Sequence, residues 1–164
     1  MPRLAVHQAL TLLQRHEPFA FAQLAQVDWI RWGSGGCPEG AIACAGGPLG
    51  RVIVLVNDPR SVDSVTLAAL LYHEALHLGT DAWGQAITIP HQCVDCTDPE
   101  QRSRDPIYQA QEQLEARLRA VTRIPKYPPQ PVPMKQDSGW GWLFAIAAGT
   151  VLISAAVATG NKGR

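Results

Sequence analysis

Two histidines four residues apart frame a glutamate in the segment LYHEALHLGTD, residues 71–81. Positions i and i+4 of a helix project to the same side, so the imidazoles of His73 and His77 can reach one metal ion. Glu74 would lie about 100° round the same helix, beside such an ion and not on it. There its carboxylate can take a proton from a metal-activated water and pass it to a leaving amine. The spacing predicts a hydrolytic metal centre, with solvated histidines on a surface helix as the alternative.

The residues around this motif predict the helix that it needs. The segment from Ser61 to Gly79 contains no internal proline or glycine and offers Ser61, Asp63 or Ser64 as an N-cap. Gly79 stands where a helix C-terminus is expected. An apolar stripe at helical spacing can pack on a sheet, so the other face can present both histidines.

A catalytic zinc usually takes three protein ligands and leaves one position for water. His91 is the main candidate for the third, because it follows a loop long enough to return over the helix. Asp81 is the alternative, although on a continued helix it would lie about 12 Å along the axis from His73. A later carboxylate, Glu112 or Glu115, is a further alternative. We therefore expect one Zn²⁺ ion with the ligands His73, His77 and His91.

The motif and its surroundings resemble the zincin metallopeptidases, in which the HExxH helix follows a strand of the sheet. The likeness covers Val52 to Cys96, and its order of buried strand, short loop and HExxH helix is similar to the small SprT-like and related minimal zincins. The resemblance implies that His73 and His77 bind zinc and that Glu74 is the general base. It also implies a third histidine ligand a dozen or more residues later, where His91 stands, and a peptide or protein substrate.

The elements expected around the motif are those of an α+β protein. Apolar spacing predicts an N-terminal helix at residues 4–13 and a short helix at 19–26. Three short strands are expected at 27–32, 41–45 and 51–56, and a polar amphipathic helix at 107–123, while residues 81–106 are expected to form a loop. We thus expect a minimal zincin-like domain: an N-terminal helix, a small and mainly antiparallel sheet, the HExxH helix and a C-terminal helix.

The C-terminal part of the chain differs in composition. The expected organisation is a peptidase domain at 1–124, a proline-rich linker at 125–139, a transmembrane helix at 140–160 and a basic tail at 161–164. The run WGWLFAIAAGTVLISAAVAT has no charge, and about 20 helical residues span about 30 Å of hydrocarbon. A buried core helix is the alternative. We expect a single-pass C-terminal membrane anchor that allows a homodimer through its small residues. The domain is expected in the cytoplasm, because no signal peptide is apparent.

Charge and cysteine content restrict the remaining possibilities. Fourteen basic residues balance fourteen acidic ones, so there is no electrostatic case for a nucleic-acid partner. The four cysteines are Cys37, Cys44, Cys93 and Cys96. Without a secretory signal a reducing compartment is the default, and three readings stay open: a second zinc site, disulfides, or ordinary packing.

These features favour a membrane-anchored, zinc-dependent peptidase. The alternatives are a non-catalytic, membrane-tethered zincin-like scaffold and a metal-dependent hydrolase that acts on something other than a peptide. Glu74 favours an enzyme, because a purely structural metal site needs no general base.

Overall fold

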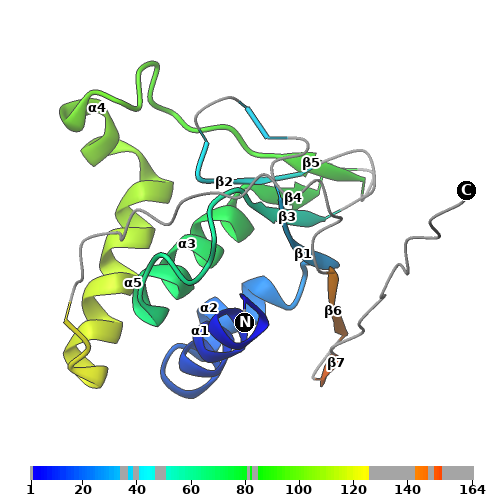
Figure 1. Cartoon of the computed structure of the whole chain (residues 1–164). Helices are drawn as coiled ribbons and strands as arrows, with labels where there is room; N and C mark the ends of the chain where they lie inside the picture. The colour runs from blue at the N-terminus through cyan, green and yellow to red at the C-terminus, as the bar shows by residue number, and fades with distance from the viewer. Residues whose placement is uncertain are drawn as a thin grey trace, which may run out of the picture.

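The computed structural model describes residues 2–33, 37–38, 41–46, 51–80, 82, 85–125, 143–147 and 150–152, and its elements confirm the α+β class. Helices pack together beside a small sheet, and a separate hairpin extends past the end of the central helix (Figure 1). In chain order the elements are α1 (Pro2–His16), α2 (Pro18–Leu24), β1 (Trp29–Trp32), β2 (Ala43–Ala45), β3 (Val52–Leu55), α3 (Ser64–Leu76), β4 (Leu78–Thr80), β5 (Ala86–Thr88), α4 (Pro99–Arg104), α5 (Pro106–Thr122), β6 (Leu143–Ala147) and β7 (Thr150–Leu152).

The larger sheet has the strand order β2-β3-β1-β6-β7. β1 and β3 are parallel, with Trp29 opposite Val52 and Trp32 opposite Leu55, and the other described pairs are antiparallel. β4 and β5 form a second, two-stranded antiparallel sheet. The expectation of a mainly antiparallel sheet is therefore confirmed, and the parallel β1–β3 pair is the exception.

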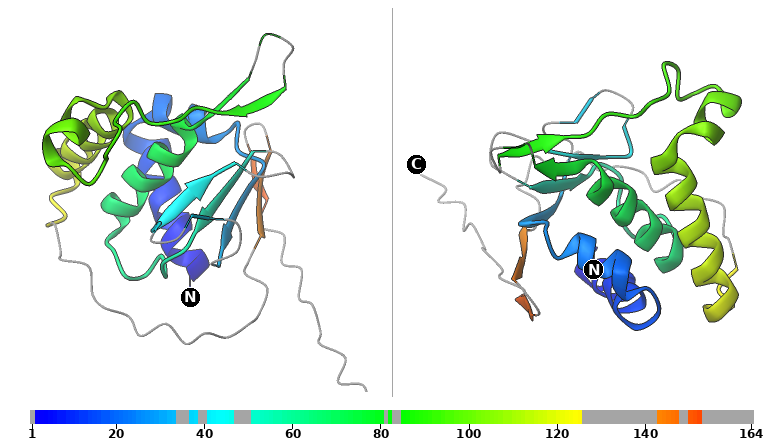
Figure 2. Two further views of the ribbon diagram at one scale, coloured as in Figure 1. Left: turned by 90° about the horizontal axis from the view of Figure 1, so that it is seen from above. Right: turned by 180° about the vertical axis from the view of Figure 1, so that it is seen from behind.

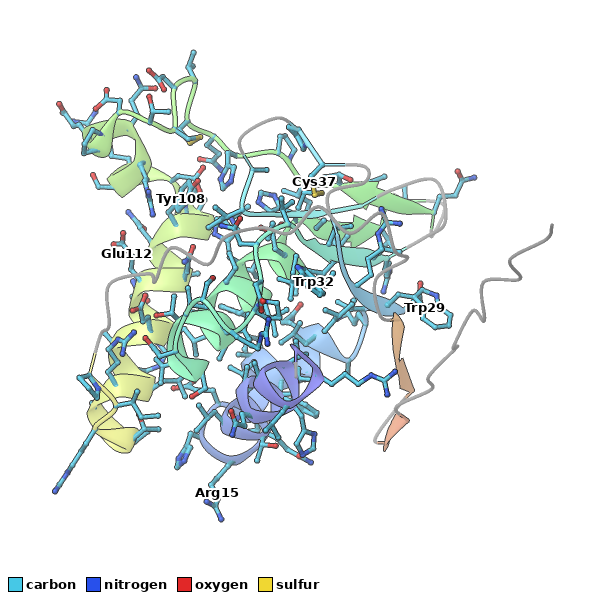
Figure 3. All side chains as sticks on the ribbon, in the orientation of Figure 1. Arg15, Trp29, Trp32, Cys37, Tyr108 and Glu112 are labelled. Carbon is cyan, nitrogen blue, oxygen red and sulfur yellow. A yellow bond between two sulfur atoms is a disulfide. The ribbon has the colours of Figure 1, made fainter. Side chains whose placement is uncertain are left out.

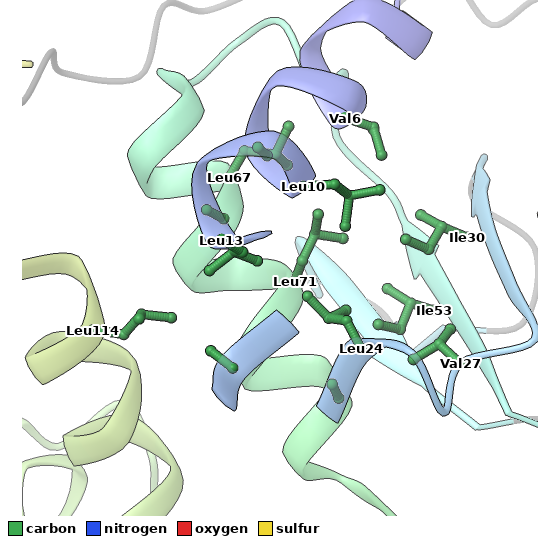
Figure 4. Packing of buried hydrophobic residues seen from close by; sticks show 14 of the residues in the cluster. Val6, Leu10, Leu13, Leu24, Val27, Ile30, Ile53, Leu67, Leu71 and Leu114 are labelled. Carbon is green, nitrogen blue, oxygen red and sulfur yellow. The ribbon is translucent and has the colours of Figure 1, made fainter. Parts of the chain in front are cut away.

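The core lies where α1 and α3 meet one face of the larger sheet, as the two views of Figure 2 show. Leu13 of α1 and Leu71 of α3 are fully buried there, in one cluster with Ile30 and Ile53 from the strands (Figure 4). Leu114 of α5 is also fully buried and joins the cluster from the other side of α3 (Figure 4). β3 is buried at all four positions, as its continuous run of branched residues predicts. The core fixes α3 between the sheet and α5, and α3 carries the HExxH motif.

Helix α3 begins where the sequence allows and ends earlier than predicted. Asp63 is its N-cap and accepts hydrogen bonds from the backbone N–H groups of Val65 and Thr66. The helix stops at Leu76, not at Gly79. The chain turns out of the helix because the next residues find partners in the second sheet, where β4 pairs with β5.

The predicted transmembrane helix at residues 140–160 is wrong. Its described parts are the strands β6 and β7, and β6 runs antiparallel to β1 with Trp29 opposite Ala145 and Arg31 opposite Leu143. An uncharged run with aromatic and β-branched residues suits a strand as well as a helix, and here β1 offers a second edge with which to pair. Among the residues that the structure describes, no helix has the length and apolar character needed to cross a membrane.

The cysteines form two short-range disulfides, Cys37–Cys44 and Cys93–Cys96. Of the three possibilities for the four cysteines, the structure therefore shows disulfides. This differs from the free thiols expected in a reducing compartment. Cys44 belongs to β2, whereas Cys93 and Cys96 lie in the connection between β5 and α4.

Candidate metal centre

Three imidazoles from two parts of the chain converge at the C-terminal end of α3. His73 lies in the last turn of the helix, His77 is its C-cap, and His91 comes from the segment after β5. One ring nitrogen from each histidine lies within 4.8 Å of the other two. The structure therefore brings together the three histidines that the sequence singles out as metal ligands.

The spacing of the first two histidines fits a single ion. Nε2 of His73 and Nε2 of His77 are 3.3 Å apart. Two nitrogens bound to a tetrahedral zinc at about 2.0–2.1 Å are expected to lie about 3.3–3.4 Å from each other. The pair thus needs little rearrangement to bind zinc.

Hydrogen bonds determine which nitrogen two of the rings present. Nδ1 of His77 lies 2.6 Å from the carbonyl oxygen of Ile89, and Nδ1 of His91 lies 3.1 Å from Oδ1 of Asp105. A carbonyl and a carboxylate only accept, so both Nδ1 atoms must carry the proton and donate it. In a neutral ring Nε2 is then the nitrogen available to a metal, as in the carboxylate–histidine arrangement around many zinc ions.

Burial keeps the helix histidines neutral. His73 is 5% exposed, and burial together with the neighbouring imidazoles of His77 and His91 lowers its pKa to about 4. Burial also lowers the pKa of His77. An imidazole binds a metal only in its neutral form, so both rings are ready to bind at neutral pH.

Glu74 lines the same cavity as the three imidazoles. Its side chain is 5% exposed, and burial raises the pKa of the carboxyl group to about 7. A carboxylate with a pKa near the working pH is suited to take up and release a proton. Glu74 is thus placed as the sequence predicts for a general base, beside the ligands and in contact with the open space.

Asp105 holds the third histidine, and sequence analysis missed it. Its carboxylate is 1% exposed and accepts hydrogen bonds from His91 and from the backbone N–H groups of Gln92, Ile107 and Tyr108. Burial alone would raise the pKa of this carboxyl group, but the hydrogen bonds outweigh it and lower the pKa to about 2. The pair Asp105-Pro106 is a recognisable helix start, yet nothing in the sequence connects it to His91.

His91 is supported by a stack of two further side chains, Tyr108 of α5 and Arg102 of α4. The Tyr108 ring is nearly parallel to the His91 ring, 4.5 Å between centroids, and the Arg102 guanidinium lies 4.4 Å from the centroid of the Tyr108 ring. Tyr108 also lies 4.8 Å from the ring of His73. Figure 3 labels Tyr108 near the start of α5, on the part of that helix that faces α3. These contacts were not predicted, because they join segments that the sequence does not pair.

Glu112 and Glu115, the other candidate ligands that the structure describes, do not belong to the cluster. Asp81 lies outside the described residues. Glu112 is exposed on α5, and Glu115 forms an ion pair with Arg119 at 2.8 Å. Of the acidic residues that the structure describes, Glu74 lines the cavity at the centre.

The cavity at the histidines has a volume of about 510 Å³. One wall comes from β2 and the residues before it, including Ile42, Ala43 and Ala45. Ile89 adds to the apolar side, while Arg102 lies on the side of α4 and α5. The cavity is thus large enough for a short segment of a polymer. It places an apolar wall next to the histidines and Glu74.

Comparisons of the chain with protein-family models, with curated proteins and with solved structures found no match. Function is therefore inferred from the residues of the site.

Proposed function

We propose that the protein is a zinc-dependent peptidase with Glu74 as its general base. The observation that carries the proposal is the convergence of three imidazole nitrogens beside a buried glutamate in an open cavity. His73, His77 and His91 would hold the ion. Zinc bound there would supply a Lewis acid that polarises a carbonyl group and makes water more acidic.

The side chains of this site can perform the proton transfers of hydrolysis. The Glu74 carboxylate accepts the proton of the attacking water, and the resulting carboxyl group donates it to the amine that leaves. The pKa of about 7 makes both directions accessible near neutral pH. Asp105 would orient His91 for binding the ion through Nε2, because its carboxylate accepts the Nδ1 proton of that ring.

The cavity supports a peptide as the substrate class. The small side chains of Ala43 and Ala45 leave room along β2 for a chain in extended conformation. Ile42 is 55% exposed and Ile89 is 42% exposed, and both line the cavity. Burial of such exposed apolar surface by a ligand is favourable, so we expect an apolar residue close to the cleaved bond.

The test is hydrolysis by the zinc-loaded protein and its Glu74→Gln variant. A mixture of unrelated short peptides is incubated with each protein, and products are identified by mass spectrometry. We expect the parent to cut internal peptide bonds and Glu74→Gln to be about 10²–10⁴-fold slower with zinc retained, since the amide cannot accept the proton. Glu112→Gln, an exposed residue of α5, is the control and should match the parent.

Two results would contradict the proposal. One is hydrolysis by Glu74→Gln at the parent rate, which would mean that Glu74 is not the general base. The other is a parent protein that binds zinc fully and cuts none of the peptides, which would favour a metal-bound scaffold.

A further inference from the structure

A cysteine pair lies directly beside the third histidine of the metal centre. Cys93 follows His91 by two residues and is joined to Cys96 by a disulfide. A ring nitrogen of His91 and the two sulfur atoms all lie within 4.8 Å of one another. A C-x-x-C pair with a histidine is a ligand set that suits zinc, provided that the sulfurs are thiolates. His91 thus belongs to two potential sets of ligands, one with His73 and His77 and one with the cysteines.

We propose that reduction of the Cys93–Cys96 disulfide creates a second metal site, which competes with the three-histidine centre for His91. The inference rests on the proposed function in one respect, since it uses the same three-histidine centre. With the disulfide formed, the ion is held by the histidines beside Glu74. With the disulfide reduced, the ion moves to His91 and the two thiolates, away from the general base.

Asp105 connects the two ligand sets. Its Oδ1 accepts the hydrogen bond of His91, and its Oδ2 accepts one from the backbone N–H of Gln92 at 2.6 Å. Sγ of Cys93 lies 3.7 Å from the same Oδ2. The negative charge of this carboxylate favours a cation on either side of His91. The choice between the sites is therefore made by the state of the sulfurs.

The disulfide is accessible to a reductant. Cys93 and Cys96 are half-buried, and Val94 between them is 98% exposed. A second cavity, of about 210 Å³, is lined by residues that include Cys93, Val94 and Gln101. A small thiol can therefore approach the sulfur of Cys93 from solvent.

The redox step is a thiol–disulfide exchange with a dithiol. One thiolate of the dithiol attacks a sulfur of the pair, the bond between Cys93 and Cys96 breaks, and a mixed disulfide forms. The second thiol of the dithiol displaces the remaining cysteine. Two electrons and two protons pass to the cysteines, and the dithiol leaves as its own disulfide. The cysteines lose these protons again when they bind the metal.

The Cys37–Cys44 disulfide provides an internal control. In the described part of the chain, neither Cys37 nor Cys44 joins a group of potential metal ligands. Both disulfides close short loops, with sequence separations of seven and three residues. Loss of Cys37–Cys44 should therefore leave the response of the metal to reduction unchanged.

The test uses the full chain dialysed against an excess of Co²⁺ and read by absorption spectroscopy, with bound cobalt measured by equilibrium dialysis. A phosphine serves as the reductant. It becomes a phosphine oxide with oxygen from water, while the two sulfurs take up the electrons and protons. We expect a sulfur-to-cobalt charge-transfer band to appear on reduction, with bound cobalt staying at one ion per chain. The band should also appear in the double variant Cys37→Ser/Cys44→Ser.

Two treatments should remove the band. The first is the double variant Cys93→Ser/Cys96→Ser. The second is iodoacetamide alkylation of reduced Cys37→Ser/Cys44→Ser, in which Cys93 and Cys96 are the remaining two of the four cysteines, so the loop keeps its sequence. The proposal is overturned if the reduced parent shows no band, if the band persists after either treatment, or if two ions bind per chain. A chain that shows the band when reduced, but hydrolyses no peptide while both disulfides are formed, would count against the proposed function and for the second site.

Discussion

The two parts of the metal centre are held in different ways. His73 and His77 belong to the end of α3, whose one face is packed in the core, so their spacing is set by the helix itself. His91 lies in an irregular segment and is held by Asp105, fourteen residues further along the chain. The helix half of the site depends on local geometry, whereas the loop half depends on contacts between distant residues.

The two halves also contribute to stability with opposite signs. Glu74 is buried at the helix end, and the rise of its pKa to about 7 means that folding disfavours its charged form. Asp105 is buried too, but four hydrogen bonds favour its charged form, and its pKa falls to about 2. At neutral pH the general base therefore destabilises the metal-free protein, and the carboxylate that holds His91 stabilises it.

The largest expected effect is the loss of a helix ligand. His73→Ala or His77→Ala removes one nitrogen from the pair whose spacing fits a zinc ion, so zinc affinity should fall by more than the roughly 10–100-fold typical of changes beyond the direct ligands. Affinity is measured by competition with a chelator. His16→Ala, an exposed histidine of α1, should leave it unchanged. Equal zinc affinity in His73→Ala and the parent would mean that α3 does not contribute this ligand to the metal centre.

The next effect concerns the unfavourable free energy of burying the charged Glu74 carboxylate when the protein folds. Its pKa is above the unfolded value of 4.5, so the cost is absent below about pH 4.5, grows between pH 4.5 and 7, and is complete above pH 7. Glu74→Gln should therefore raise the free energy of unfolding of the metal-free protein by about 1–3 kcal/mol at pH 8, and by almost nothing at pH 4.5. Urea unfolding across this range measures the difference.

The lowered pKa of His73 acts in the opposite direction. Stability from His73 is complete above about pH 6.5 and is lost as the pH falls toward 4. The contribution of His73 is the same in the parent and in Glu74→Gln, so it cancels in the difference between their free energies of unfolding. Glu112→Gln, the same change at an exposed position of α5, is the matched control. A difference between Glu74→Gln and the parent that does not vary with pH would mean that folding imposes no cost on the charge of Glu74.

A smaller effect is expected from the residue that holds the loop half. Asp105→Asn keeps a good N-cap for α5 but removes one of the two carboxylate oxygens shared by His91 and Gln92. Zinc affinity should fall about 10–100-fold, and the unfolding free energy should fall as well. Asp98→Asn changes the N-cap of α4 without touching a ligand. If Asp98→Asn weakens zinc binding as much as Asp105→Asn, Asp105 has no specific role toward His91.

The difference between the halves also explains what the sequence predicts. The cap at Asp63, the continuous helix, and the buried strand β3 are local features, and each of them is visible in the residue pattern. The i, i+4 spacing then places His73 and His77 on one side without further information. The end of α3 was misplaced because its position depends on β5, a strand that the sequence assigned to a loop.

Contacts between segments that are distant in the sequence could not be predicted from local residue patterns. Asp105 and Tyr108 reach His91 because α5 packs beside α3, and the periodicity of α5 does not specify that arrangement. The helix α4 carries a start signal in Asp98-Pro99 that was overlooked. The uncharged run near the C-terminus satisfies a helix and a strand equally well, and pairing of Leu143–Ala147 with β1 decides for the strand.

The most direct test of the metal centre is X-ray absorption spectroscopy of the full chain loaded with one equivalent of zinc, with both disulfides formed. We expect three imidazole nitrogens and no sulfur in the first coordination shell, and two imidazoles in His91→Ala. Sulfur ligands in the oxidised protein, or an unchanged shell in His91→Ala, would contradict the assignment of His73, His77 and His91 to one ion.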